Sequence, residues 1–117
     1  MTDKQRLALR LLLKRLTKPL QFHHGDCKGA DEEAAEIALG LGIYVISHPS
    51  NTEPRAHTRS HEEWDIDKPL ERNRDIVNAS DILIAAPSSL KEQLRSGTWA
   101  TIRYARHMCL PTIILDP

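Results

Sequence analysis

Four short apolar runs alternate along the chain with four stretches that have the pattern of helices. The apolar runs are continuous, which is typical of strands that are buried on both faces of a sheet. Such strands, separated by helices, predict an α/β fold with a mostly parallel sheet of about four strands, flanked by helices. The predicted strands are residues 20–24 (LQFHH), 43–47 (IYVIS), 81–87 (DILIAAP) and 111–115 (PTIIL).

The first helical stretch is TDKQRLALRLLLKRLTK, residues 2–18. Thr2 and Gln5 have the spacing of a capping box. The following leucines predict one apolar stripe, formed by Leu9, Leu12, Leu13 and Leu16.

A second helix is predicted after Gly29. The acids at 31–33 suit the positive end of its dipole, and Gly40 and Gly42 mark its end. Its expected buried face is Ala34, Ile37, Ala38 and Leu41.

Two further helices are predicted, at residues 70–78 and 97–109. The second of them should place Trp99, Ile102, Ala105 and Cys109 along one face. Residues 50–69 lack periodicity and are predicted to form a long loop, which in a small domain is usually functional or mobile.

Composition restricts the class of protein. The 117 residues predict one domain, residues 1–117, and the 16 basic and 16 acidic side chains cancel. A broad basic face for nucleic acid is therefore disfavoured. Cys27 and Cys109 make no disulfide framework, and we find neither a membrane-crossing apolar run nor a signal-peptide pattern. We expect a reduced, cytoplasmic setting without membrane association.

The stretch FHHGDCKGADEEAAEIA, residues 22–38, carries the richest chemistry. A metal site is disfavoured because His23 and His24 are adjacent on a strand and point to opposite faces. We expect one of them to pack inward with a hydrogen bond and the other to line the ligand edge. Cys27 could be a nucleophile, since Lys28 and a helix N-terminus would lower its pKa, but no orienting third group is visible.

A phosphate-binding turn fits this stretch better. Gly25 and Gly29 flank a strand-to-helix turn, where free backbone N–H groups and the helix dipole attract an anion. The backbone from Gly25 to Ala30 would then hold phosphate. An ordinary turn that uses glycine for its shape is the competing interpretation.

A second turn, RSGTWAT at residues 95–101, again places a glycine and hydroxyls at a helix start. Ser96 or Thr98 could cap the helix or bind a phosphate oxygen.

In ERNRDIV, Arg72 and Arg74 are two apart on a helix, so only one of them should reach the site. The turns after the strands that end near 24, 47 and 87 should all meet at one edge of the sheet.

Together, HHGDCKGADEEAAEIA, LERNRDIV, DILIAAP and SGTWATIRYA resemble the SLOG superfamily, over roughly residues 4–117. This group includes DNA-processing protein A and the Lonely Guy phosphoribohydrolases. The resemblance implies a Rossmann-like three-layer sandwich that binds a nucleotide or a nucleotide-derived ligand. From the residues we expect neither a cofactor nor a metal. The site residues that the resemblance implies are Gly25, Asp26, Lys28, Gly29, Ala30, Asp31, Arg72, Asn73, Arg74, Pro87, Ser96, Gly97 and Thr98.

The chain departs from that family pattern in two places. Thr101 stands where the Lonely Guy hydrolases have their glutamate, so we expect a sensor or carrier. The alternatives are an N-glycosidase or phosphoribohydrolase that uses Asp26, Asp31 or Glu71, and a module associated with single-stranded DNA. The usual first strand, which is central in the sheet, is also absent.

Three consequences of the absent strand are open. The strands at 20–24 and 81–86 could pair directly, a partner could supply the strand, or the chain could start upstream. Unpaired strand edges attract other chains, so we expect a homodimer through those edges or through the apolar stripe of the first helix.

Overall fold

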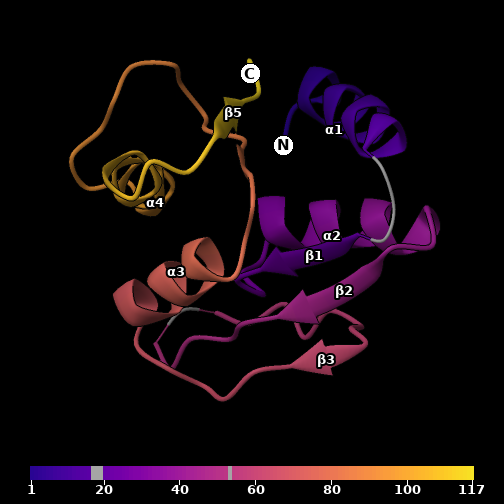
Figure 1. Ribbon diagram of the computed structural model, residues 1–117, viewed down its shortest axis with the longest axis horizontal. Helices are drawn as coiled ribbons and strands as arrows, with labels where there is room; N and C mark the ends of the chain where they lie inside the picture. The colour runs from indigo at the N-terminus through magenta and orange to yellow at the C-terminus, as the bar shows by residue number, and fades with distance from the viewer. Residues whose placement is uncertain (17–19, 53) are drawn as a thin grey trace.

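The computed structural model describes residues 1–16, 20–52 and 54–117. Helices and strands alternate along the chain, as Figure 1 shows. The helices are α1 (Asp3–Arg15), α2 (Ala30–Gly40), α3 (Pro69–Asn78) and α4 (Gly97–His107). The strands are β1 (Gln21–His24), β2 (Tyr44–Ser47), β3 (Glu62–Glu63), β4 (Leu83–Ala85) and β5 (Thr112–Ile114). The α/β class with parallel strands is therefore confirmed.

The strands form two separate parallel sheets. One has the order β1-β2-β3, with Phe22 opposite Val45 and Ile46 opposite Glu62. The other pairs β4 with β5, with Ile84 opposite Ile113. The four predicted strands are all present, but β1 and β4 do not pair with each other, so the sheet does not close directly across the position of the absent strand.

The short strand β3 lies inside residues 50–69, which the sequence predicted to be a loop. Both of its residues are exposed, so no apolar pattern could have marked it. Backbone groups on either side of β3 hold it to β2: the N–H groups of His61 and Trp64 donate to the carbonyls of Val45 and Ser47, each at 2.9 Å.

The capping box of α1 is confirmed. The Thr2 hydroxyl accepts from the Gln5 backbone N–H at 3.0 Å, and the Gln5 side chain accepts from the Thr2 N–H at 3.1 Å. The Gln5 amide then donates to the carbonyls of Pro87 and Leu115, at 2.8 and 3.2 Å. The beginning of α1 is thereby tied to the carboxyl ends of β4 and β5. The predicted continuation of this helix through residues 17 and 18 lies outside the described residues.

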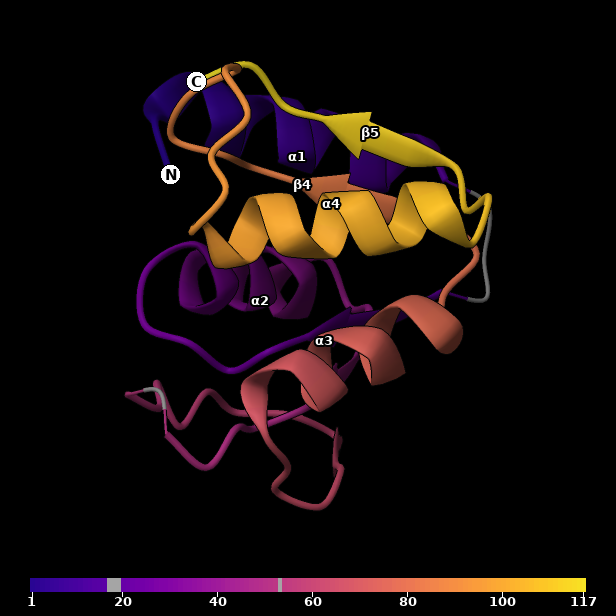
Figure 2. The same cartoon turned by 90° about the vertical axis from the view of Figure 1, so that its left-hand side faces the viewer.

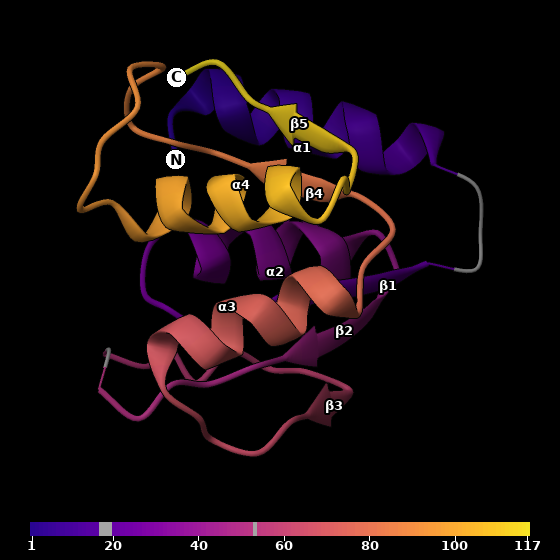
Figure 3. The same ribbon diagram turned by 60° about the vertical axis from the view of Figure 1, so that its left-hand side comes forward.

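The helices form two pairs. α1 packs against α2, and α3 packs against α4. Figures 1, 2 and 3 show the α1–α2 pair and the α3–α4 pair on opposite sides of the strands. The main core cluster lies under α1 and α2 and joins the two sheets (Leu9, Leu13, Ala35, Ala38, Ile43, Val45 and Leu115). Each helix in the described part of the chain is too short or too polar to span a membrane.

Burial corrects three details of the predicted faces. Leu9 and Leu13 of the α1 stripe pack against α2 within the chain and are not free to form an interface, whereas Leu12 and Leu16 are only partly buried. On α2, Ala35 and Ala38 are the buried residues, and Ala34, Ile37 and Leu41 pack around them only partly buried.

The third correction concerns α4. This helix buries Trp99, Ile102 and Ala105 but ends at His107. Cys109 lies beyond that end with φ of 57° and is exposed, because the chain turns away from the helix there.

Candidate ligand site at the carboxyl ends of the strands

The turns after β1, β2 and β4 meet at one edge, as predicted. The guanidinium of Arg72, on α3, donates from Nη1 to the carbonyls of Gly25 and His48, at 2.6 and 3.2 Å. Arg72 is 4% exposed. A single buried side chain therefore holds the turn after β1 beside the turn after β2, and the turn after β4 borders the same cavity through Ala86.

Asp26 fixes the long connection after β2. Its carboxylate is fully buried and forms an ion pair with Arg55 at 2.8 Å, and it accepts from the Thr58 N–H at 2.9 Å. Burial acts to raise the pKa of Asp26, but the hydrogen bonds from Thr58 and Arg55 outweigh it and lower the pKa. These contacts engage both carboxylate oxygens of Asp26, which gives this residue a structural role in the turn.

The predicted phosphate turn binds a carboxylate of its own chain. Asp31 accepts from the backbone N–H groups of Gly25 and Cys27, at 3.0 and 3.4 Å. Gly25 is required by this close approach, because a Cβ at this position would lie 2.8 Å from both Asp31 Oδ2 and Arg72 Nη1. Two of the N–H groups that we expected to hold phosphate are therefore already bonded.

Gly29 has φ of 97°, which favours glycine, but no atom lies within 4 Å of the position of its Cβ. Gly29 and Lys28 are exposed and lie outside the lining of the cavity described below. They shape the turn before α2.

Only one of the two arginines reaches this region, as expected. Arg74 points away and lies over the ring of Tyr104, at 5.4 Å from its centroid. Asn73 accepts from Nε of Arg72 at 2.9 Å and also lines the cavity.

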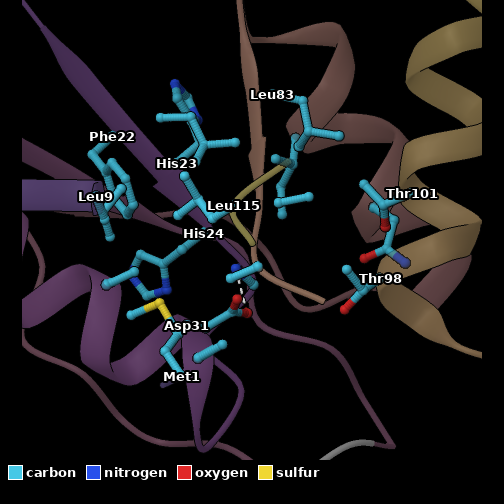
Figure 4. A pocket seen from close by; sticks show the side chains of 18 residues that line it. Met1, Leu9, Phe22, His23, His24, Asp31, Leu83, Thr98, Thr101 and Leu115 are labelled. Atoms are coloured by element: carbon cyan, nitrogen blue, oxygen red, sulfur yellow. Dashed lines mark hydrogen bonds between the residues drawn. The ribbon is translucent and has the colours of Figure 1, made fainter. Parts of the chain in front are cut away.

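A cavity of about 160 Å³ opens between the β1–α2 side and the β4–α4 side of this edge. Figure 4 shows His24, Asp31 and Met1 on one wall and Thr98 and Thr101 on the other. Of the predicted site residues, Gly25, Ala30, Asp31, Asn73 and Thr98 line it. Pro87, Ser96 and Gly97 lie close by in sequence but do not line it.

His24 lines the cavity and has a buried polar atom without a hydrogen-bond partner. It is 4% exposed, and its Nδ1 accepts from the Asp26 backbone N–H at 3.0 Å. A ring nitrogen that accepts carries no proton, so in the neutral ring the proton lies on Nε2. Burial lowers the pKa of His24, against the opposing charges of Asp31 and Asp26, and thus favours this neutral form. Nε2 is buried and has no hydrogen-bond partner.

The opposite wall is the first turn of α4. The Ser96 hydroxyl caps this helix by accepting from the Trp99 N–H at 3.3 Å, so its predicted capping role is the one observed. Thr98 is exposed at the helix start, and the Thr101 hydroxyl donates to the Gly97 carbonyl at 3.0 Å. The first N–H groups of a helix lack partners within the helix and favour an anion.

A histidine cluster lies beside the cavity and was not predicted from the sequence. His23 Nδ1 and His48 Nε2 are 2.8 Å apart, and the Trp64 ring lies 4.3 Å from that of His48. Burial, with smaller effects of His23, His24 and Arg72, lowers the pKa of His48 to about 4. No group of three His, Cys, Asp or Glu side chains within residues 1–16, 20–52 and 54–117 is arranged to hold a metal ion.

Comparison with known proteins supports the fold. No protein-family model and no curated protein matches the chain. The solved structure of a protein from Syntrophus aciditrophicus, described as a "Putative molybdenum carrier protein", is similar with a TM-score of 0.62 and 22% sequence identity. The match covers 82% of this chain but only 62% of the other. At this identity the likeness establishes a shared fold.

Proposed function

We propose that this chain binds a nucleotide or a nucleotide-derived anion, as a SLOG-like carrier or sensor in the cytoplasm. The observation that carries the proposal is that His24, which lines the cavity, has a buried Nε2–H donor without a partner. A buried donor left unsatisfied costs about 1–3 kcal/mol, and a ligand oxygen would remove that cost. The N-terminus of α4 on the opposite wall favours a negative ligand.

The size of the cavity restricts which part of the ligand enters. At about 160 Å³ it is smaller than the roughly 300–1,000 Å³ of pockets that enclose a whole drug-sized ligand. We therefore place the anionic group between His24 and Thr98, with the rest of the ligand extending outward.

A tetraoxo-anion is a second candidate for the same position. The similar protein from Syntrophus aciditrophicus is named as a molybdenum carrier, and molybdate has the oxygen acceptors that His24 Nε2–H and a helix N-terminus would bind. It is also small enough to fit the cavity without any part outside it.

Hydrolysis of a nucleotide is the alternative activity. Asp26 and Asp31 are both held by N–H donors, and Glu71 is exposed on α3 and lies outside the cavity lining. Thr101 lines the cavity in place of a carboxylate. We therefore favour binding without cleavage. Association with single-stranded DNA is the less favoured third function, because the formal charge is zero.

The test is calorimetric titration with nucleoside monophosphates, inorganic phosphate and molybdate. In His24→Asn the side-chain oxygen can replace Nδ1 as acceptor for the Asp26 N–H, but the Nε2 donor is lost. We expect the affinity for the bound anion to fall by about tenfold or more, as for a hydrogen bond to a charged group. His107→Asn, on the exposed last turn of α4, is the matched control.

Three results would contradict the proposal. One is unchanged affinity in His24→Asn, and another is no binding of any of these anions at millimolar concentration. Chromatographic detection of free base after incubation with a nucleoside monophosphate would favour the hydrolase instead.

The homodimer remains a prediction: Leu9 and Leu13 of the α1 stripe are buried, whereas Leu12 and Leu16 are only partly buried. Light scattering at micromolar concentration tests it through the mass of the particle.

A further inference from the structure

β1 and β4 border a slot that runs along both strands. Besides the cavity at the ligand site, a second cavity of about 630 Å³ lies between the strands. Phe22 and His23 of β1 and Leu83 and Ile84 of β4 line both cavities, and Figure 4 shows Phe22 and His23 on the strand opposite Leu83. The two cavities are thus parts of one slot.

The two bordering strands run in the same direction. The larger cavity reaches Gln21 and Ile82, at or just before the starts of the two strands. The smaller one reaches His24 and Ala85, at their carboxyl ends. A strand between them could therefore be parallel to both.

The backbone edges that face the slot carry no sheet pairing in the described chain. β1 pairs with β2 and β4 pairs with β5. The His24 carbonyl accepts from His48 N–H at 2.8 Å, and Leu83 N–H donates to Pro111 at 2.9 Å, so these groups face away from the slot. Successive residues of a strand direct their backbone groups to opposite sides, which turns those of His23 and Ile84 toward it.

We propose that the slot binds one extended, apolar β-strand of another polypeptide, parallel to β1 and β4 and hydrogen-bonded to both. An extended strand is the backbone form that presents donors and acceptors on both of its sides at the spacing of a sheet.

The residues that line the slot indicate which side chains the bound strand should carry. Leu9 and Leu13 of α1 line the slot from one helix pair, and Ile76 of α3 lines it from the other. A strand with apolar surfaces on both faces has a continuous apolar sequence. Its carboxyl end would fill the apolar part of the smaller cavity and leave the polar end around His24 open.

A second copy of this chain is a poor source for the strand. Every strand in residues 1–16, 20–52 and 54–117 is already paired within a sheet. The copy would have to give up one of these pairings to supply a strand. A different polypeptide has no such cost.

The test uses the 117-residue chain and a fluorescent peptide of alternating valine and isoleucine with a lysine at each end. The control peptide has the same sequence with N-methyl groups at alternate positions, which removes its donors and keeps its apolar side chains. We expect saturable binding by fluorescence anisotropy, about tenfold weaker for the N-methylated peptide. Hydrogen exchange at the amides of His23 and Ile84 should slow when the peptide binds.

Variants locate the binding. Ile84→Lys places a charge in the slot and should weaken peptide binding by about tenfold or more, whereas Ile66→Lys on the exposed segment after β3 should not. Thermal unfolding of both variants checks that they fold. If Ile84→Lys does not fold, the comparison of the two peptides on the unsubstituted protein still tests the proposal.

Three outcomes would overturn the proposal. They are no peptide binding, equal binding of the N-methylated peptide, and a dimer that protects His23 and Ile84 without peptide. The third would identify a second copy as the occupant.

Discussion

The close approach of Arg72 and Asp31 to Gly25 predicts a large cost for the smallest possible side chain there. In Gly25→Ala the new Cβ would lie 2.8 Å from Arg72 Nη1 and from Asp31 Oδ2, where ordinary contacts begin at 3.4 Å. Neither neighbour is free to move, because Nη1 donates to the Gly25 carbonyl at 2.6 Å and Oδ2 accepts from the Gly25 N–H at 3.0 Å.

The magnitude follows from those two anchors. Added atoms in a well-packed place cost about 1–3 kcal/mol, and a hydrogen bond to a charged group contributes about 1.5–3 kcal/mol. We expect Gly25→Ala to lower the free energy of unfolding by about 2–3 kcal/mol. For a chain of this size that corresponds to a fall in Tm of roughly 10 °C.

Urea denaturation followed by circular dichroism measures this difference. Gly97→Ala is the matched control, because no atom lies within 4 Å of its Cβ position and it is the first residue of α4. The control should be as stable as the parent or more stable by up to about 1 kcal/mol. If the free energy of unfolding of Gly25→Ala is also within about 0.5 kcal/mol of that of the parent, the turn accommodates the Cβ at little cost and the reasoning is wrong.

Three further predictions concern stability and reactivity. Arg55→Ala should lower the free energy of unfolding by about 3 kcal/mol, because it leaves the buried carboxylate of Asp26 without its ion pair; an unfolding midpoint equal to that of the parent would exclude this. For His48, the folded-state pKa of about 4 lies below the ordinary 6.5, so its neutral form should stabilise the fold above pH 6.5 and lose this effect as the pH falls toward 4. Urea midpoints measured across this range should fall less steeply in His48→Gln, and equal slopes would contradict the assignment. Cys27→Ser should leave anion affinity by calorimetry unchanged, since the thiol lies outside the cavity lining, and a loss of binding would implicate the thiol.

Much of the fold followed from local sequence. The capping box at Thr2 and Gln5 depends on two residues three apart, and it is present. The continuous apolar runs at 43–47 and 81–87 predicted buried parallel strands, because such strands meet apolar neighbours on both faces. That Arg72 and Arg74 would face different ways followed from helix periodicity; Arg72 holds the turn at Gly25, although it does not line the cavity.

The site depended on contacts that the sequence pattern did not show. The turn at Gly25 looked open to phosphate, but the Asp31 carboxylate folds back onto its N–H groups. The sequence indicated free backbone N–H donors in this turn, but it did not show that the Asp31 carboxylate would accept from them. The sequence predicted that one of His23 and His24 would pack inward with a hydrogen bond, as His24 does. It did not predict that Nε2 of His24 would have no partner, because that depends on burial and on the Asp26 N–H.

The sequence by itself determined which segments are helices and which are buried strands, since caps and periodicity act within a few residues. Tertiary structure alone decided that the strands divide into two sheets, that β3 joins β2 through backbone bonds, and that His48 meets His23 and Trp64. These arrangements depend on backbone hydrogen bonds and burial between segments far apart in the chain. Backbone groups are the same in every residue except proline, so the sequence pattern carries little record of how they pair.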